Sequence, residues 1–399
     1  MAVLRFRLVF RIFLGSLLLI GTISTFLMLQ ASQISYVNKL KPRSYEENLP
    51  VDTIRPSLRT LSEHARKSSD DVTRSDLNPT TAPRRRSLVI FGDDRSGTTL
   101  LTRMFSEDSN IFSVYEPLWI TRNWRKTERD RDQVKDVTDV VSALMSCHFL
   151  ENPTAMKFLE HTSKKWAPGL FKNPFQSPPI CNGTDKGKKV TCPSPETVPK
   201  LVEEACLRHY KHSVTKLAIV RVPERKLSNI FPRIIYDNPD TEIKILHVVR
   251  DPRGSINSRI NLGWLREVDK AKNFAAWPKS TCEGITQNVK YGASLKGRLK
   301  KNYMLVKYKD IAFSPVLTAM KIYKFAGFEM QESLIRWIIH ATNPNKETLD
   351  KEAKKAFSSF RNSKANAEKW RQESPLKRTR IIEQECGELL DLLHLERLT

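Results

Sequence analysis

Two short polar segments of this chain contain the residue types that bind phosphate-like anions. The first segment follows the apolar run 88–91 and precedes a helical pattern that begins at Leu100; it consists of Asp93, Asp94, Arg95, Ser96, Gly97, Thr98 and Thr99. A turn between a strand and a helix points backbone N–H groups and the positive end of the helix dipole at one place. We therefore expect an anion site here, with a plain turn capped by a threonine as the alternative.

The glycine spacing around this segment resembles that of a nucleotide-binding P-loop, but one residue of that motif is missing. Gly92 and Gly97 are spaced as in the first half of a nucleotide-binding P-loop, but Thr98 stands where that motif has a lysine. Without the lysine, the β- and γ-phosphates of a nucleoside triphosphate lack their usual cation. The sequence thus disfavours a P-loop nucleotide kinase, which remains an alternative, and leaves Arg95 as the cation of the loop.

The second polar segment follows another apolar run, residues 243–249. It consists of Arg250, Asp251, Pro252, Arg253, Gly254, Ser255, Ile256, Asn257 and Ser258. Pro252 is suited to the first position of a helix, and arginine can hold a phosphate with two hydrogen bonds. Two anion sites on neighbouring strand ends predict one ligand with phosphates at both ends of a nucleoside.

Glu116 is the candidate general base, because it directly follows a predicted strand at 111–114 and can reach the mouth of the first loop. A structural pairing of Glu116 with an arginine is the alternative. Trp119 and Trp124 could stack on a sugar ring, and each could equally be a core residue. Trp264, which follows the second motif, could lie near the adenine or the acceptor. Arg361, near the C-terminus, could close over the bound nucleotide.

With the sequence Tyr-Glu-Pro-Leu-Trp of residues 115–119 between them, the two motifs resemble those of Golgi carbohydrate sulfotransferases. The resemblance covers residue 87 to the C-terminus and is strongest to the group that sulfates galactose, N-acetylgalactosamine or N-acetylglucosamine at the 6-hydroxyl. It implies that the donor is 3′-phosphoadenosine 5′-phosphosulfate (PAPS), that no metal is needed, and that the acceptor is a glycan or glycosaminoglycan. A catalytically inactive glycan-binding protein on the same fold is the alternative.

The resemblance also implies residue roles. The first motif corresponds to the 5′-phosphosulfate loop, where Arg95, Thr98 and Thr99 would stabilise the transferred group. The second corresponds to the 3′-phosphate site, where Arg250 and Ser258 would bind, with Arg253 as an auxiliary. Related enzymes often use a glutamate or a histidine as the base, which fits Glu116. Nothing in the sequence accounts for the negative charge of Asp93 and Asp94 beside an anion site.

The elements that position these residues alternate between strand and helix patterns. This alternation predicts an α/β fold with a mostly parallel sheet flanked by helices on both faces, the P-loop-like sulfotransferase fold. The predicted strands are 88–91, 111–114, 215–221, 243–249 and 302–308, and the predicted helices include 134–149, 155–161, 196–212, 224–236, 285–300, 316–326, 331–341 and 376–393.

The N-terminal segment predicts a membrane anchor. Residues 12–29 are predominantly apolar and long enough to span a bilayer, and the arginines at positions 5, 7 and 11 should keep the N-terminus cytoplasmic. We favour an uncleaved transmembrane helix over a cleaved signal peptide. The predicted organisation is a cytoplasmic tail at 1–11, a transmembrane signal anchor at 12–31, a stem at 32–86 and a lumenal catalytic domain at 87–399, in a single-pass type II protein of the Golgi membrane.

The cysteines and the charge agree with a lumenal location. Six cysteines lie beyond the anchor and permit three disulfides, with Cys181 and Cys192 as the pair we expect around a loop that also carries the glycosylation sequon at Asn182. The net charge of +23 favours polyanionic partners. No nucleic-acid-binding module is recognisable, so we expect an anionic glycan rather than nucleic acid. A homo-oligomer is left open.

Overall fold

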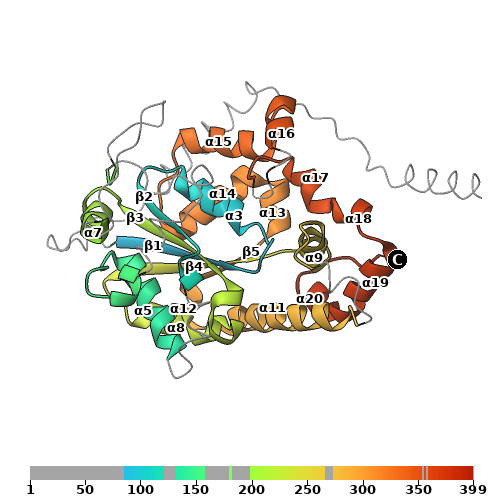
Figure 1. The fold of residues 1–399 in the computed structure, drawn as a ribbon, viewed down its shortest axis with the longest axis horizontal. Helices are drawn as coiled ribbons and strands as arrows, with labels where there is room; N and C mark the ends of the chain where they lie inside the picture. Colours follow the sequence, from blue (N-terminus) through green and yellow to red (C-terminus); the bar gives the residue numbers. More distant parts are fainter. Residues whose placement is uncertain are drawn as a thin grey trace, which may run out of the picture. The chain divides into compact units, whose positions relative to one another are not determined.

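The computed structural model describes residues 85–120, 132–157, 179–181, 198–265, 273–352, 355 and 358–398, all within one compact unit (Figure 1). The described residues form a parallel sheet of five strands in the order β2-β3-β1-β4-β5. The strands are β1 Arg85–Gly92, β2 Ile111–Tyr115, β3 His212–Ala218, β4 Thr241–Val249 and β5 Tyr303–Lys307. The predicted parallel sheet is confirmed.

Helices cover both faces of the sheet because each strand is apolar on both sides. In β1, Leu88 and Ile90 point into one buried cluster, while Val89 and Phe91 point into the other. The first cluster packs under α3 Thr98–Ser106, α13 Tyr308–Phe313, α14 Pro315–Ala326 and α15 Glu332–Thr342. The second packs under α5 Gln133–Ser146, α7 Val198–Arg208 and α8 Phe231–Tyr236. Figure 1 shows α3, α13, α14 and α15 above the sheet and α5 and α8 below it.

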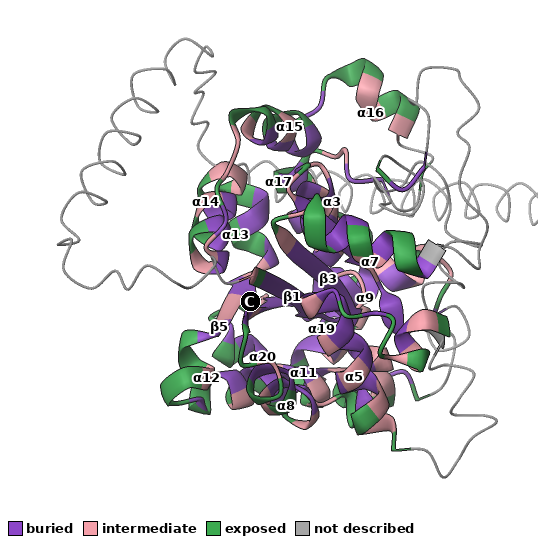
Figure 2. Ribbon diagram, turned by 90° about the vertical axis from the view of Figure 1, so that its left-hand side faces the viewer, coloured by how far each residue is buried: buried purple, intermediate pink, exposed green. Residues whose placement is uncertain are grey.

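The remaining helices lie between β4 and β5 in the chain or after β5. A third buried cluster joins α9 Pro252–Asn261, α11 Ala276–Ser294, α19 Leu376–Glu385 and α20 Gly387–Leu392. The others are α12 Gly297–Lys301, α16 Lys346–Glu352, α17 Ser363–Glu368 and α18 Trp370–Glu373. Figure 2 shows the buried sheet and the largely exposed α12 and α16, which have no fully buried residue.

Several predicted element boundaries are wrong, for local reasons. The strand predicted to end at 221 stops at Ala218 and turns into a 3-10 helix, η3 Ile219–Arg221. The helix predicted at 224–236 divides into the short turns η4 Pro223–Arg225 and η5 Leu227–Asn229 before α8 begins. Pro232 lies in the first turn of α8, where a missing N–H costs nothing. The helix predicted at 376–393 is interrupted at Cys386.

Two disulfides each join helices that share a buried cluster. Cys147 at the end of α5 joins Cys206 in α7, and Cys282 in α11 joins Cys386 between α19 and α20. Cys181 is also in a disulfide. Its predicted partner Cys192 lies outside the described residues, as do Asn182, Trp124 and the predicted tail, anchor and stem up to residue 84. Among the described helices none is long and apolar enough to span a bilayer.

Candidate active site

The sheet brings the two anion-binding segments together. β1 and β4 are hydrogen-bonded neighbours, with Gly92 paired to Val248, so the turns that follow both strands leave the same edge of the sheet. The chain passes from β3 on one side of β1 to β4 on the other, and ligands of open α/β sheets bind at such a switch point. Arg250 Nη1 donates to the carbonyl oxygen of Arg95 at 3.0 Å, which joins the two turns directly.

The first turn is shaped to expose the amino end of α3. Gly97 is the N-cap of α3, with φ of 98°, a conformation that favours glycine. A Cβ atom at this position would also overlap the ring of Tyr308. No side chain caps α3, so the alternative of a threonine cap is wrong, and the first N–H groups of the helix stay available for an anion. Thr98 is buried, and the Thr99 hydroxyl lies 3.4 Å from that of Tyr115.

Arg259 accounts for the charge of Asp93, one of the two aspartates that the sequence left unexplained. Its Nη2 donates to Asp93 Oδ2 at 2.5 Å and to the carbonyl oxygen of Asp94 at 2.6 Å. Asp93 Oδ1 in turn accepts from the N–H of Asp94 at 2.9 Å. Asp93 is therefore paired inside the protein, and it fastens the first turn to α9.

Arg250 crosses the site between the two turns. Its guanidinium lies 4.5 Å from the centroid of the Tyr308 ring, and its Nη2 donates to the carbonyl oxygen of Asn366 at 3.1 Å. Gly254 leaves room for the Arg250 side chain, because a Cβ atom at position 254 would come 3.2 Å from Arg250 Nε and 3.1 Å from Trp370 Cδ1. Ser258, one turn further along α9, accepts from Arg95 Nε at 3.1 Å. Arg95, Arg250 and Ser258 thus converge as predicted.

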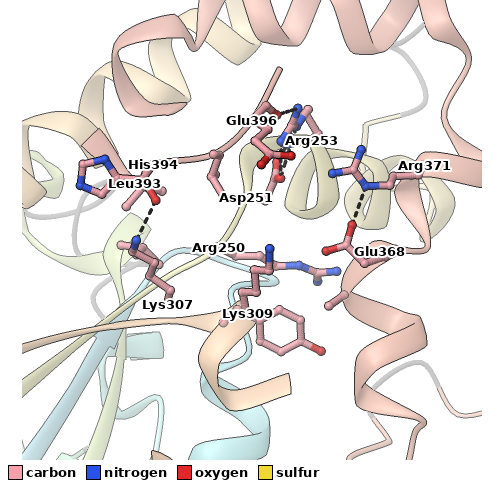
Figure 3. A pocket seen from close by; sticks show the side chains of 14 residues that line it. Arg250, Asp251, Arg253, Lys307, Lys309, Glu368, Arg371, Leu393, His394 and Glu396 are labelled. Atoms are coloured by element: carbon pink, nitrogen blue, oxygen red, sulfur yellow. Dashed lines mark hydrogen bonds and ion pairs between the residues drawn. The ribbon is translucent and has the colours of Figure 1, made fainter. Parts of the chain in front are cut away.

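Arg253 points away from this convergence. It is 1% exposed and donates to Asp251, to Glu383 at 2.5 Å and to the carbonyl oxygen of Glu396 at 2.8 Å. Trp370 covers its other side, with the guanidinium 4.3 Å from a ring centroid. Figure 3 shows Arg253 in a neighbouring cavity beside Glu396 and Asp251, with Arg250 lying across the middle. These contacts tie α9 to the C-terminal helices.

Some of the other residues of the second motif hold the fold together, and one lines the candidate site. Asp251 caps α9 by accepting from the N–H of Arg253, and Pro252 begins the helix as predicted. Ser255 and Ile256 are buried, and Ile256 belongs to the third core cluster. Asn257 lines the site, and its Nδ2 donates to Glu373 at 3.0 Å.

Two adjoining cavities lie over these residues and share Arg95, Arg250, Arg361 and Asn366. The larger, of about 360 Å³, reaches the range of small-molecule sites. Much of their wall comes from the C-terminal segment, namely Ser358, Ser359, Arg361, Ser363, Asn366, Lys369, Trp370 and Glu373. Of the residues in this wall, sequence reasoning had assigned a role only to Arg361.

The arginines that line both cavities give them a positive charge, which favours binding of an anion. Burial, together with the nearby charges of Arg361 and Arg250, lowers the pKa of Arg95 to about 10. Burial also lowers the pKa of Arg250, with a further contribution from Arg361. Three buried polar atoms of the lining residues, the donors Arg250 Nε and Ser359 Oγ and the acceptor Asn257 Oδ1, have no hydrogen-bond partner among the described residues. Clustered guanidinium groups and unsatisfied donors are what a multiply charged anion would neutralise.

Glu116 lies at the end of β2, two strands away from β1. Its backbone has φ of 49°, and its buried carboxylate accepts from Lys216 Nζ through one oxygen and from Arg221 Nη1 through the other. The alternative of a structural pairing with an arginine is therefore observed, which leaves the role of general base as a prediction. Sequence reasoning missed Lys216, although it is a lone charge within an apolar strand.

Aromatic rings border the site on two sides. Tyr308, which the sequence placed at the end of a strand, begins α13 and packs against Arg250, while its hydroxyl accepts from Asn366 Nδ2 at 2.9 Å. Trp264 is 48% exposed, and the Arg95 guanidinium lies 5.9 Å from its ring centroid. Trp264 is thus near the first turn and not in the core. The side chain of Trp119 lies outside the described residues.

Comparison with known proteins identifies this arrangement. The sulfotransferase domain family matches residues 85–394, from the first residue of β1 to the segment after α20. The chain belongs to the sulfotransferase family. The chain is therefore a sulfotransferase enzyme, and family membership decides against a nucleotide kinase.

Individual relatives of this sulfotransferase carry more specific names. Carbohydrate sulfotransferase 1 of Danio rerio is 27% identical over 316 residues, which are 72% of each chain. Carbohydrate sulfotransferase 3 of Tetronarce californica is 27% identical over 340 residues, 77% of this chain and 72% of the relative. A solved sulfotransferase domain from a Synechococcus olefin synthase is 15% identical, with a TM-score of 0.39, over 78% of this chain and 98% of that one. The predicted resemblance to carbohydrate sulfotransferases is confirmed.

Proposed function

We propose that this sulfotransferase moves a sulfuryl group from PAPS to the 6-hydroxyl of a sugar in a glycan or glycosaminoglycan. The observation that carries the proposal is the convergence of Arg95, Arg250 and Arg361 on one cavity at the amino end of α3. A nucleoside with anionic groups at its 5′ and 3′ positions matches two basic turns that are joined by the Arg250–Arg95 hydrogen bond.

The residues present fit such a donor. The first turn offers the uncapped N–H groups of α3 and the cation of Arg95 to the 5′-phosphosulfate. Arg250 and Ser258, which both line the larger cavity, would hold the 3′-phosphate, and Arg250 Nε has no hydrogen-bond partner among the described residues. Tyr308 provides an aromatic surface beside Arg250. Among the described residues, no group of three histidine, cysteine or carboxylate side chains could hold a metal ion.

The reaction we propose is an in-line displacement at sulfur. A bond forms from the acceptor oxygen to sulfur as the bond from sulfur to the 5′-phosphate oxygen breaks, and the hydroxyl proton passes to Glu116. Arg95 and the N–H groups of α3 would stabilise the charge on the transferred group and on the leaving phosphate. The acceptor class is supported by the names of the relatives, which are carbohydrate sulfotransferases.

Turnover with labelled donor tests the proposal. The full-length protein, solubilised in detergent, is incubated with PAPS carrying labelled sulfur and a panel of desulfated glycans. We expect label in one class of glycan and, after digestion, on the 6-hydroxyl of its hexose. Binding of glycans without transfer would instead support the inactive glycan-binding alternative, and label on another position would refute the 6-hydroxyl assignment alone.

The membrane anchor belongs to the same proposal. We propose that residues 12–31 hold the enzyme in the Golgi membrane with residues 87–399 in the lumen, on the basis of the apolar segment and its arginine flank. The protein should then stay with membranes during alkaline extraction and carry a glycan on Asn182. A mature N-terminus downstream of residue 29 on all cellular protein would reject this topology.

A further inference from the structure

Left-handed backbone is concentrated at the edge of the sheet that carries the site. Among the described residues, six non-glycine positions have positive φ, and Cys147 and His394 follow helix ends. The other four lie in the turns after the first three strands: Arg95 after β1, Glu116 after β2, and Glu224 and Arg225 after β3. Such strain persists where the surrounding structure enforces it, and it clusters at functional sites. The first two turns belong to the site already described, whereas the third has no assigned role.

Asn288 enforces the conformation of this third turn. It is 2% exposed in the middle of α11, and its Nδ2 donates to the carbonyl oxygen of Arg225 at 2.9 Å. Its Oδ1 accepts from the N–H of Leu227 at 2.7 Å, so the side-chain amide of Asn288 is hydrogen-bonded to the backbone on both sides of residue 226. A third bond, from Nδ2 to the carbonyl oxygen of Gly284 at 2.9 Å, orients the amide itself. The buried side chain of Asn288, which we call the clamp, therefore holds the backbone next to the strained residues Glu224 and Arg225.

The turn adjoins the candidate base and presents a cation. It begins just after Arg221, whose guanidinium binds the carboxylate of Glu116. Glu224 is paired with Lys226 at 2.6 Å, so these two charges cancel. Arg225 between them is exposed, and its side chain has no hydrogen bond or ion pair with any described residue. The strained turn thus holds one guanidinium that has no partner among the described residues, four positions after the arginine that binds Glu116.

We propose that residues 222–226 form an acceptor-binding loop in which Arg225 contacts an anionic group on the glycan, either a hexuronate carboxylate or a sulfate ester. A guanidinium can bind both groups with two parallel hydrogen bonds. Asn288 is a positioning residue that fixes the direction of Arg225. This inference rests on the proposed sulfotransfer to a glycan and adds the chemistry by which a sugar next to the reacting one is recognised.

Kinetics with matched acceptors test the role of Arg225. Three oligosaccharides are compared: a neutral lactosamine, a lactosamine with one sulfate ester, and a chondroitin oligosaccharide with hexuronate. We expect Arg225→Ala to raise KM for at least one anionic acceptor about tenfold or more, since a charge-assisted contact is lost, and to leave the neutral acceptor and retention on 3′,5′-ADP unchanged. Which anionic acceptor responds identifies the group that is bound.

Arg208→Ala is the matched control, because Arg208 is exposed at the end of α7, by the opposite edge of the sheet (Figure 1). It should leave KM unchanged for every acceptor. An Arg225→Ala variant whose KM values equal those of the wild type, or rise equally for neutral and anionic acceptors, would overturn the inference. Failure of the wild type to sulfate any of the three would instead refute the proposed function.

Asn288→Asp tests the clamp separately. The aspartate can still accept from Leu227 but cannot donate to the carbonyl of Arg225. We expect a higher KM for the anionic acceptor with 3′,5′-ADP retention unchanged, and no further rise when Arg225→Ala is added, because both changes remove one contact. Effects that simply add, or that fall equally on neutral acceptors, would show that Asn288 does not act through Arg225.

Discussion

Arg250 donates a hydrogen bond to the carbonyl oxygen of Arg95, 155 positions earlier in the chain. The bond connects the turn after β4 with the turn after β1, and it holds the two basic groups at a set separation. A ligand that bridges the turns is therefore selected by the distance between its two anionic groups as well as by its charge. A nucleoside with substituents at the 5′ and 3′ positions has such a fixed span.

Donor binding should fail when either arginine is removed. We expect Arg95→Ala and Arg250→Ala each to weaken binding by roughly 1.5–3 kcal/mol, the worth of a charge-assisted hydrogen bond. Immobilised 3′,5′-ADP should retain the wild type and the Arg208→Ala control but release both variants. Equal retention of all four proteins would contradict the assignment of the two anion sites.

The substitution Glu116→Gln tests whether Glu116 is the general base or only a structural ion-pair partner. If Glu116 accepts the proton, turnover should fall about 10²–10⁴-fold with little change in donor affinity. The substitution also leaves Lys216, whose side chain is 3% exposed, without its carboxylate, which should lower the melting temperature.

The double variant Glu116→Gln/Lys216→Met resolves the two effects. Replacing both Glu116 and Lys216 by uncharged groups should restore part of the melting temperature, although Arg221 still loses the Glu116 carboxylate. Turnover should stay low if Glu116 is the base. Turnover within a few-fold of the wild type in the single variant would remove Glu116 from the mechanism.

Asp93→Asn tests whether the acidic residues of the first turn are structural. Asp93 and Arg259 are both nearly buried, and losing the carboxylate leaves a buried guanidinium unpaired. We expect a loss of about 3 kcal/mol or more in the free energy of unfolding, measured by urea denaturation. An Asp93→Asn protein as stable as the wild type, with weaker donor binding only, would indicate instead that Asp93 acts on the ligand.

Stability should fall on acidification, in part through His212. Burial, aided by the charges of Arg86, Arg85 and Lys211, lowers the pKa of His212 to about 4 in the folded protein, against about 6.5 for an unfolded chain. The unfolded state therefore binds the proton first, so the stability that the neutral imidazole supports is complete above about pH 6.5 and is lost as the pH falls toward 4.

A non-titrating ring at this position should reduce the effect. His212 stacks on Phe328 with ring centroids 4.3 Å apart, and His212→Phe can keep an aromatic contact. The difference in melting temperature between pH 7.5 and pH 5.0 should be smaller in this variant than in the wild type. The exposed His209, changed to Phe, serves as the control, and an unchanged difference in both variants would contradict the assignment.

The sequence by itself determined the local parts of the site. An apolar run followed by glycine, arginine and small polar residues specifies a strand, a turn and a helix start within about ten residues, so both motifs could be predicted together with the parallel sheet. Where local geometry departed from the pattern, the prediction failed: left-handed Glu224 and Arg225 broke the helix expected at 224–236.

Only the tertiary structure decided which residues meet. The strand order puts β4 beside β1, the C-terminal residues Arg361 and Asn366 beside both, Arg259 on Asp93, and Lys216 on Glu116. Each of these pairings joins residues about a hundred or more positions apart. No periodicity along the chain encodes them, because they follow from the packing of whole strands and helices, in which a buried charge must find its partner wherever the fold brings one.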